Sequence, residues 1–248
     1  MTLDVELHDG PEELTSAIAD ALLRSLVDCQ QRLGVASVVL TGGGIGIGLL
    51  RALSVHPDRD TLDWRRVDVW FGDERYLPLG HPDRNDTQAL GALLDHVSLD
   101  LARAHFMPSP DGAAGEDADA AAQLYAREME HASGAPGTAP RFDVCLLGMG
   151  PDGHVASLFP GRVSLTATTL TVAERESPKA PPVRVSLTFG AINSSAQVWL
   201  LAAGPEKASA VQSVLGGALP AETPAAGVHG RDRTVLWADK AAYPAVGA

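Results

Sequence analysis

The chain is short of positive charge, and above all of lysine. Its 19 Lys+Arg stand against 31 Asp+Glu, which gives a formal net charge of −12 with histidine neutral. Because contact with nucleic-acid phosphates requires a basic face, we expect no nucleic-acid partner. An acidic protein also repels an anionic substrate at long range, so any such substrate must be captured by local positive groups.

Cysteine is also scarce, and long apolar runs are missing. Cys29 and Cys145 lie in apolar contexts, which favours buried thiols in a reducing compartment over a disulfide framework or a metal cluster. No apolar run approaches the roughly 20 residues that span a bilayer. The acidic, alternating start is not typical of a signal or transit peptide. We therefore expect a cytoplasmic protein with no membrane partner.

Apolar runs that alternate with helical patterns indicate the fold class. Strands are predicted at 35–40, 67–71, 142–147, 197–202 and 234–238, and helices at 14–33 after Pro11, 45–53, 87–94, 118–129 and 206–215. Runs that are apolar on both faces are typical of parallel strands covered by helices. The pattern predicts an α/β fold: a doubly wound, mainly parallel sheet with helices on both faces. No shift of composition divides the chain, so we expect a single domain over 1–248.

Polar or glycine-rich segments follow four of the predicted strands directly. They cover residues 41–44, 72–75, 148–154 and 204–207. In an open parallel sheet, ligands bind outside the carboxyl ends of the strands. We therefore expect these segments, far apart in the sequence, to meet at one edge of the sheet.

Gly42, Gly43 and Gly44 precede a predicted helix. Glycines let backbone N–H groups approach an anion, and a helix N-terminus adds a favourable dipole. The segment lacks the Gly-Lys-Ser/Thr of a P-loop and also misses G-x-G-x-x-G. We interpret it as a phosphate-binding turn; a tight turn without a ligand is the alternative.

Residues 148–153 do match G-x-G-x-x-G after a strand, which alone would suggest a dinucleotide site. Asp152 argues against this, because its carboxylate would lie beside the pyrophosphate, and the match also lies past the middle of the chain. The next residue, His154, can accept a proton near neutral pH, and Asp152 can orient it. We take His154 as a candidate general base, and an ordinary loop histidine as the alternative.

The remaining candidates bind anions or hydroxyl groups. Asp73 and Arg75 follow a strand, where Arg75 can bind an anion bidentately and a carboxylate can contact substrate hydroxyls; a solvated charged turn is the alternative. Lys207 follows Gly204 at the start of a predicted helix, and Lys179 and Arg184 lie in a proline-rich segment that leads into a strand. With no H-E-x-x-H, C-x-x-C or G-x-S-x-G motif, neither a zinc site nor an α/β-hydrolase serine is expected.

Taken together, these segments resemble the glucosamine-6-phosphate isomerase/6-phosphogluconolactonase family, and within it the lactonases. The resemblance lies in residues 71–76, 83–85, 147–161, 178–188 and 204–208, of which G-M-G-P-D-G-H-V-A-S-L-F-P-G is the most specific. It implies a fold of the NagB/RpiA type and hydrolysis of 6-phospho-D-glucono-1,5-lactone in the oxidative pentose phosphate pathway, without a cofactor or metal. It also implies that His154 and Asp152 form a catalytic pair. The substrate-binding residues that it implies are Gly42, Gly43, Gly44, Asp73, Arg75, Asn85, Lys179, Arg184 and Lys207.

One departure and two alternatives accompany this resemblance. Thr41 stands where the family's glycine loop has a serine, which leaves side-chain contacts to phosphate open. A related sugar-phosphate deaminase is the first alternative, although Phe159 occupies the position of its ring-opening glutamate. A non-catalytic sugar-phosphate sensor is the second, although the chain shows no basic helix-turn-helix. The oligomeric state is left open, with a monomer favoured.

Overall fold

Buried aliphatic strands form the larger of two sheets. The protein is described by a computed structural model that covers residues 2–243. Within this range six strands, all parallel, lie in the order β1-β9-β8-β5-β2-β3. In that order they span Leu3–His8, Arg233–Asp239, Gln197–Ala202, Val144–Gly148, Ala36–Leu40 and Val67–Phe71. The central strands β2, β5 and β8 are buried almost throughout, as their apolar runs predict.

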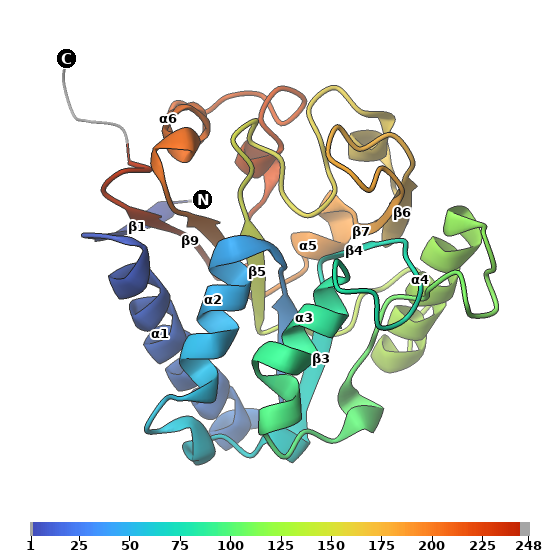
Figure 1. Cartoon of the computed structure of the whole chain (residues 1–248), viewed down its shortest axis with the longest axis horizontal. Coiled ribbons are helices and arrows are strands. Elements are labelled where there is room, and N and C mark those ends of the chain that lie inside the picture. Colours follow the sequence, from blue (N-terminus) through green and yellow to red (C-terminus); the bar gives the residue numbers. More distant parts are fainter. Residues whose placement is uncertain (1, 244–248) are drawn as a thin grey trace.

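Six α-helices are described within residues 2–243: α1 (Pro11–Leu33), α2 (Gly43–Ser54), α3 (Asn85–Ala92), α4 (Ala118–Ser133), α5 (Phe189–Ile192) and α6 (Ala208–Leu215). Helix α1 begins with Pro11 and ends before Gly34, whose φ of +80° suits a glycine C-cap. Helices α1, α2 and α3 lie side by side in front of the larger sheet, and α4 packs against the smaller one (Figure 1).

The smaller sheet consists of β4 (Asp73–Arg75), β7 (Arg184–Leu187) and β6 (Thr171–Glu174), paired antiparallel in that order. The sequence predicts a polar segment after β3 and no strand within it, and the structure corrects this for Asp73–Arg75, which form β4. These three residues lack the apolar run of a core strand, yet they pair with β7 because Gly72 redirects the chain. The Gly72 N–H donates to the Leu40 carbonyl of β2, and its carbonyl accepts from Leu187 N–H at the end of β7.

The predicted fold class is confirmed: an α/β fold with a mainly parallel sheet flanked by helices. The ends of the observed helices and strands differ from the predicted ones by a few residues. The last predicted helix, 206–215, begins as α6 only at Ala208, because residues Pro205–Lys207 form a 3₁₀ turn first. The single-domain organisation over 1–248 stays a prediction, and Met1 and 244–248 lie outside the described residues.

A buried charged network joins β4 to the start of α3. The Glu74 carboxylate accepts hydrogen bonds from the backbone N–H groups of Arg75, Asn85 and Asp86, at 2.8, 2.7 and 2.9 Å. Two of these donors, Asn85 and Asp86, are the first residues of α3. Their N–H groups have no partner within the helix, and the Glu74 carboxylate accepts from both. The fully buried Arg84 pairs with Asp86 at 2.5 Å and lies 3.9 Å from Glu74. The network thereby fixes Asp73, Arg75 and Asn85 relative to the larger sheet.

We expect Arg84→Met to lower the free energy of unfolding by about 3–5 kcal/mol, because it leaves two buried carboxylates uncompensated. Chemical denaturation measures this change. Arg103→Met is the matched control, since the Arg103–Asp68 pair is partly exposed and is worth at most about 1 kcal/mol. Equal losses in both variants would contradict the role given to the network.

The pH dependence gives a second measure of the same substitution. Burial, with the neighbouring Asp86 carboxylate, raises the pKa of Glu74 from its ordinary 4.5 to about 7. Stability from a raised carboxyl pKa is complete below the unfolded value and is lost as the pH rises through the folded one. Removing the guanidinium raises this pKa further, so the loss caused by Arg84→Met should be smaller at about pH 5 than at about pH 8.

Candidate functional site

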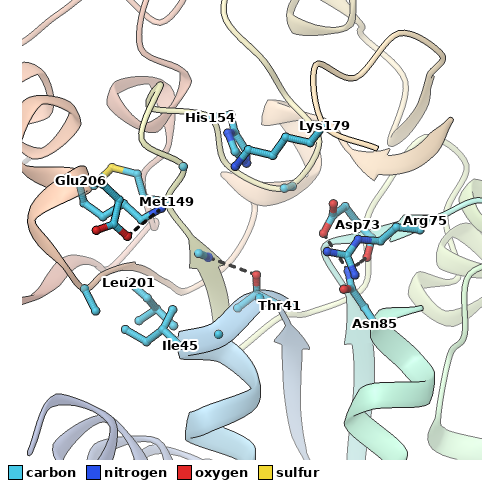
Figure 2. Close-up of a pocket in the computed structure, with 18 of the residues that line it drawn as sticks. Thr41, Ile45, Asp73, Arg75, Asn85, Met149, His154, Lys179, Leu201 and Glu206 are labelled. Carbon is cyan, nitrogen blue, oxygen red and sulfur yellow. Dashed lines mark hydrogen bonds and ion pairs between the residues drawn. The ribbon is translucent and has the colours of Figure 1, made fainter. Parts of the chain in front are cut away.

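A cavity of about 520 Å³ opens where the carboxyl ends of the central strands meet the smaller sheet. All four predicted segments contribute to it, which is the convergence expected from the sequence. Figure 2 shows Thr41 and Ile45 on one side, Asp73, Arg75 and Asn85 on another, and His154 and Lys179 above them. Of the predicted site residues, these line the cavity: Gly42, Gly43, Gly44, Asp73, Arg75, Asn85, His154, Lys179, Arg184 and Lys207. Asp152 is the exception and contacts His154 instead.

The glycine turn forms the first turn of α2. Gly42 is the N-cap, and Gly43 begins the helix with a φ of +80°, so the free N–H groups of this turn lie at the cavity. A side chain at Gly42 has no room, because its Cβ would come 1.9 Å from Asn85 Oδ1. The hydroxyl of Thr41 accepts a hydrogen bond from Gly148 N–H at 3.2 Å, which ties the ends of β2 and β5 together. The Thr41 hydroxyl is therefore already bonded to the protein backbone.

His154 and Asp152 form a close pair beside the cavity. Nδ1 of His154 lies 2.5 Å from Asp152 Oδ1, and the histidine side chain is only 12% exposed. Burial opposes ionisation of Asp152, but the hydrogen bond and charge of His154 together with backbone N–H groups lower its pKa to about 2. An ionised carboxylate only accepts, so Nδ1 carries the hydrogen and Nε2 keeps the lone pair of a base.

Glycine at 150 makes room for this pair. A Cβ there would lie 1.9 Å from His154 Nδ1 and 2.5 Å from Asp152 Oδ1. Gly153, with a φ of +76°, completes the turn, and the Gly150 N–H donates to the His154 carbonyl at 2.9 Å. The apparent G-x-G-x-x-G match thus has a packing cause. Phe159 also lies against the imidazole, with ring centroids 4.5 Å apart and ring planes tilted by 37°.

Positive groups outnumber carboxylates around the cavity. Its lining residues include four cationic side chains, those of Arg75, Lys179, Arg184 and Lys207. They include two carboxylates, those of Asp73 and Glu206. Such a local surplus suits the capture of an anion by a protein of net charge −12. Glu206 was not predicted, although it directly precedes Lys207 and lies 3.9 Å from its amine.

The four cations differ in how far they are committed to the protein itself. Arg184 is buried and donates to the carbonyls of Pro181 at 2.9 Å and Lys179 at 3.2 Å, so it orders the segment before β7. Arg75 Nη1 donates to the Asp83 carbonyl at 2.5 Å. Lys207 and Lys179 keep more of their donors for a ligand. Burial and the charges of Lys207, Arg184 and Arg75, opposed by Asp152, lower the pKa of Lys179.

Ser157 is a site residue that sequence reasoning missed. Its hydroxyl donates to Asp73 Oδ2 at 2.6 Å, and Asn85 Nδ2 reaches Asp73 Oδ1 at 3.2 Å. Ala156, just before it, has a φ of +49°, a strained value for a residue with a side chain. The strained turn carries the chain from His154 to Ser157 and so holds the Asp73 carboxylate at the cavity wall. The fully buried serine sits within the 147–161 motif, but nothing in its type or spacing distinguishes it.

The part of the chain that the structure describes also bears on metal ligands, membrane-spanning helices and the two cysteines. Within residues 2–243, no three His, Cys, Asp or Glu side chains are grouped as metal ligands would be. None of the helices described there has the length and apolarity to cross a bilayer. Both thiols are buried and free, as predicted, and burial raises the pKa of Cys29 to about 11 and of Cys145 to about 12.

Known proteins resemble the chain over nearly its whole length. Residues 9–237 match the family model of glucosamine-6-phosphate isomerases/6-phosphogluconolactonase. The 6-phosphogluconolactonase of Streptomyces coelicolor is 51% identical over 97% of this chain and 94% of its own length, and that of Mycobacterium tuberculosis is 45% identical over 96% and 95%. The crystal structure of the Leishmania guyanensis 6-phosphogluconolactonase superposes with a TM-score of 0.84 at 28% identity, covering 100% of both chains. The chain therefore belongs to the glucosamine-6-phosphate isomerase/6-phosphogluconolactonase family.

Proposed function

We propose that this protein hydrolyses 6-phospho-D-glucono-1,5-lactone to 6-phospho-D-gluconate in the oxidative pentose phosphate pathway, with His154 as the general base. The lactonases of Streptomyces coelicolor and Mycobacterium tuberculosis, at 51% and 45% identity, support the activity. The observation that carries the mechanism is the Asp152–His154 pair beside a cavity rich in cations. A cytoplasmic location stays a prediction that the buried free thiols favour.

The chemistry needs one proton acceptor and one stabilised oxyanion. Nε2 of His154 takes a proton from water as the oxygen attacks the lactone carbonyl, a role worth roughly 10²–10⁴-fold. Asp152 does not touch the substrate; it holds the imidazole and stabilises its charged form. Negative charge then develops on the carbonyl oxygen, which the cavity's cations and backbone N–H groups stabilise. As the tetrahedral intermediate collapses, the ring oxygen leaves and takes the proton back from the imidazolium.

The phosphate serves as the handle for binding. The N–H groups at the start of α2, with Arg75, Arg184 and Lys207, are proposed to hold it, and Lys179 is the weaker candidate. Asp73 and Asn85 face the same cavity and are proposed to accept from or donate to sugar hydroxyls. Because Arg184 is largely bonded to carbonyls, we expect Lys207 to carry more of the phosphate binding.

His154→Ala should lower kcat by roughly 10²-fold or more, within the range of general-base catalysis. Asp152→Asn should lower it less, because the amide can still contact Nδ1 but stabilises the imidazolium poorly. Lactone disappearance above the spontaneous rate is the measurement, with circular dichroism as the check on folding. Near-normal turnover of folded His154→Ala would remove this histidine from the mechanism.

Lys207→Ala should raise KM for the phosphorylated lactone by roughly 10- to 100-fold, since a charged hydrogen bond is worth about 1.5–3 kcal/mol. Lys240→Ala is the matched control, because Lys240 is exposed and pairs with Asp9 away from the cavity. An unchanged KM in Lys207→Ala would contradict the role of this lysine. If both variants raised KM alike, net charge and not a specific contact would be the cause.

Incubation with glucosamine 6-phosphate should release no ammonia above background. Opening a pyranose ring requires an acid beside the histidine, and here that position is filled by Phe159, which is 2% exposed and lies tilted against the imidazole. Phenylalanine cannot transfer a proton, whereas ester hydrolysis needs only the base and the oxyanion contacts. Ammonia release at a rate that rivals lactone hydrolysis would make a deaminase the better description.

A further inference from the structure

The chain contains only three lysines, and each lies in a different environment. Lys240 is exposed and hydrogen-bonded to Asp9, an ion pair that raises its pKa. Lys207 is mostly buried at the cavity and lies 3.9 Å from the Glu206 carboxylate. Lys179 also lines the cavity, but within residues 2–243 it forms no ion pair with a carboxylate. Of the three amines, that of Lys179 is therefore the least committed to a partner.

The backbone at Lys179 is held firmly, so its side chain starts from a defined point. The Lys179 N–H donates to Ser177 Oγ at 3.2 Å, and its carbonyl accepts from Ser177 Oγ at 3.0 Å and from Arg184 Nη2 at 3.2 Å. From there the side chain extends across the cavity toward His154 (Figure 2). A primary amine thus shares the cavity with the residue proposed to activate water.

The surroundings make the neutral, nucleophilic form of this amine easier to reach than in an ordinary lysine. Burial of the side chain and the positive charges of Lys207, Arg184 and Arg75 lower the pKa of Lys179, and the Asp152 carboxylate only partly opposes them. A lysine beside other cations is a common way to obtain an amine that attacks carbonyl carbon. Arginine at this position would keep the charge without providing such a nucleophile.

We propose that Lys179 is a site of self-acylation, at which its amine intercepts the lactone held in the cavity. This rests on the proposed function, because the acyl donor is the proposed substrate. Nζ attacks the lactone carbonyl, the bond from that carbon to the ring oxygen breaks, and a carbon–nitrogen bond forms. The proton lost by the amine passes through His154 to the ring oxygen, which becomes a hydroxyl. The product is an open-chain 6-phosphogluconoyl amide, and no other reactant is needed.

Self-acylation would limit the number of turnovers. The amide removes one positive charge and leaves a phosphorylated chain inside a cavity of about 520 Å³, where it excludes the next substrate. Hydrolysis and acylation compete for the same bound lactone, so each turnover carries a small probability of inactivation. Activity should therefore decline with the amount of lactone consumed and not with time alone.

The test is to add freshly made 6-phosphogluconolactone to the enzyme repeatedly and to map the adducts by peptide mass spectrometry. With only three lysines, each site is read separately. We expect an added mass equal to that of the lactone at Lys179, formed on the order of tenfold or more faster than at Lys240, because the bound lactone has a high effective concentration there. Lys179→Arg should lose this adduct and should decline more slowly per lactone consumed.

Gluconolactone without the phosphate is the control acyl donor. It should label Lys179 far more slowly than the phosphorylated lactone does, since it lacks the group that holds the substrate in the cavity. Normal hydrolysis with no adduct at Lys179, or with equal labelling of Lys240, overturns the inference and leaves the proposed function intact. Failure to hydrolyse the lactone above its spontaneous rate contradicts the proposed function itself, and this inference with it.

Discussion

The site depends first on one buried carboxylate, that of Glu74. It lies between β4 and the start of α3 and accepts from three backbone N–H groups, while Arg84 and Asp86 complete the network around it. The residues on either side of this network, Asp73 and Arg75 on β4 and Asn85 on α3, all line the cavity. A network that does not itself line the cavity thus positions three residues that do, which gives these buried charges a structural role.

The part of the cavity around His154 follows a different constraint, which is lack of space. Gly150 has no room for a Cβ because the His154–Asp152 pair lies against it, and Gly42 has none because Asn85 does. Glycine at both positions therefore lets a side chain approach the backbone closely, and at Gly150 this accounts for part of the apparent nucleotide signature. The same motif letters describe a phosphate contact in one fold and a packing requirement in another.

The sequence predicted the parts of the structure that depend on local pattern. Apolar runs located the core strands, and the carboxyl-end rule brought 41–44, 72–75, 148–154 and 204–207 to one cavity. It missed the smaller sheet, since Asp73–Arg75 reads as a turn and becomes a strand only by pairing with β7. It also missed Ser157, whose place depends on its hydrogen bond to Asp73, 84 residues away, and Glu206, which lies beside Lys207 at the cavity. Candidate roles for His154, Arg75 and Lys207 followed from their residue types at strand ends, whereas Asn85 came only from the family resemblance.

Gly72 has a consequence for how the protein loses activity. Its N–H donates to the last residue of β2 and its carbonyl accepts from the last residue of β7, so this one residue is hydrogen-bonded to both sheets. His154 follows a strand of the larger sheet, whereas Arg75 and Arg184 pair within the smaller one. Separation at this junction would move His154 away from Arg75 and Arg184 while both sheets stay hydrogen-bonded. On heating, inactivation is thus expected to precede the loss of secondary structure, a gap that parallel activity and far-ultraviolet circular dichroism measurements would reveal.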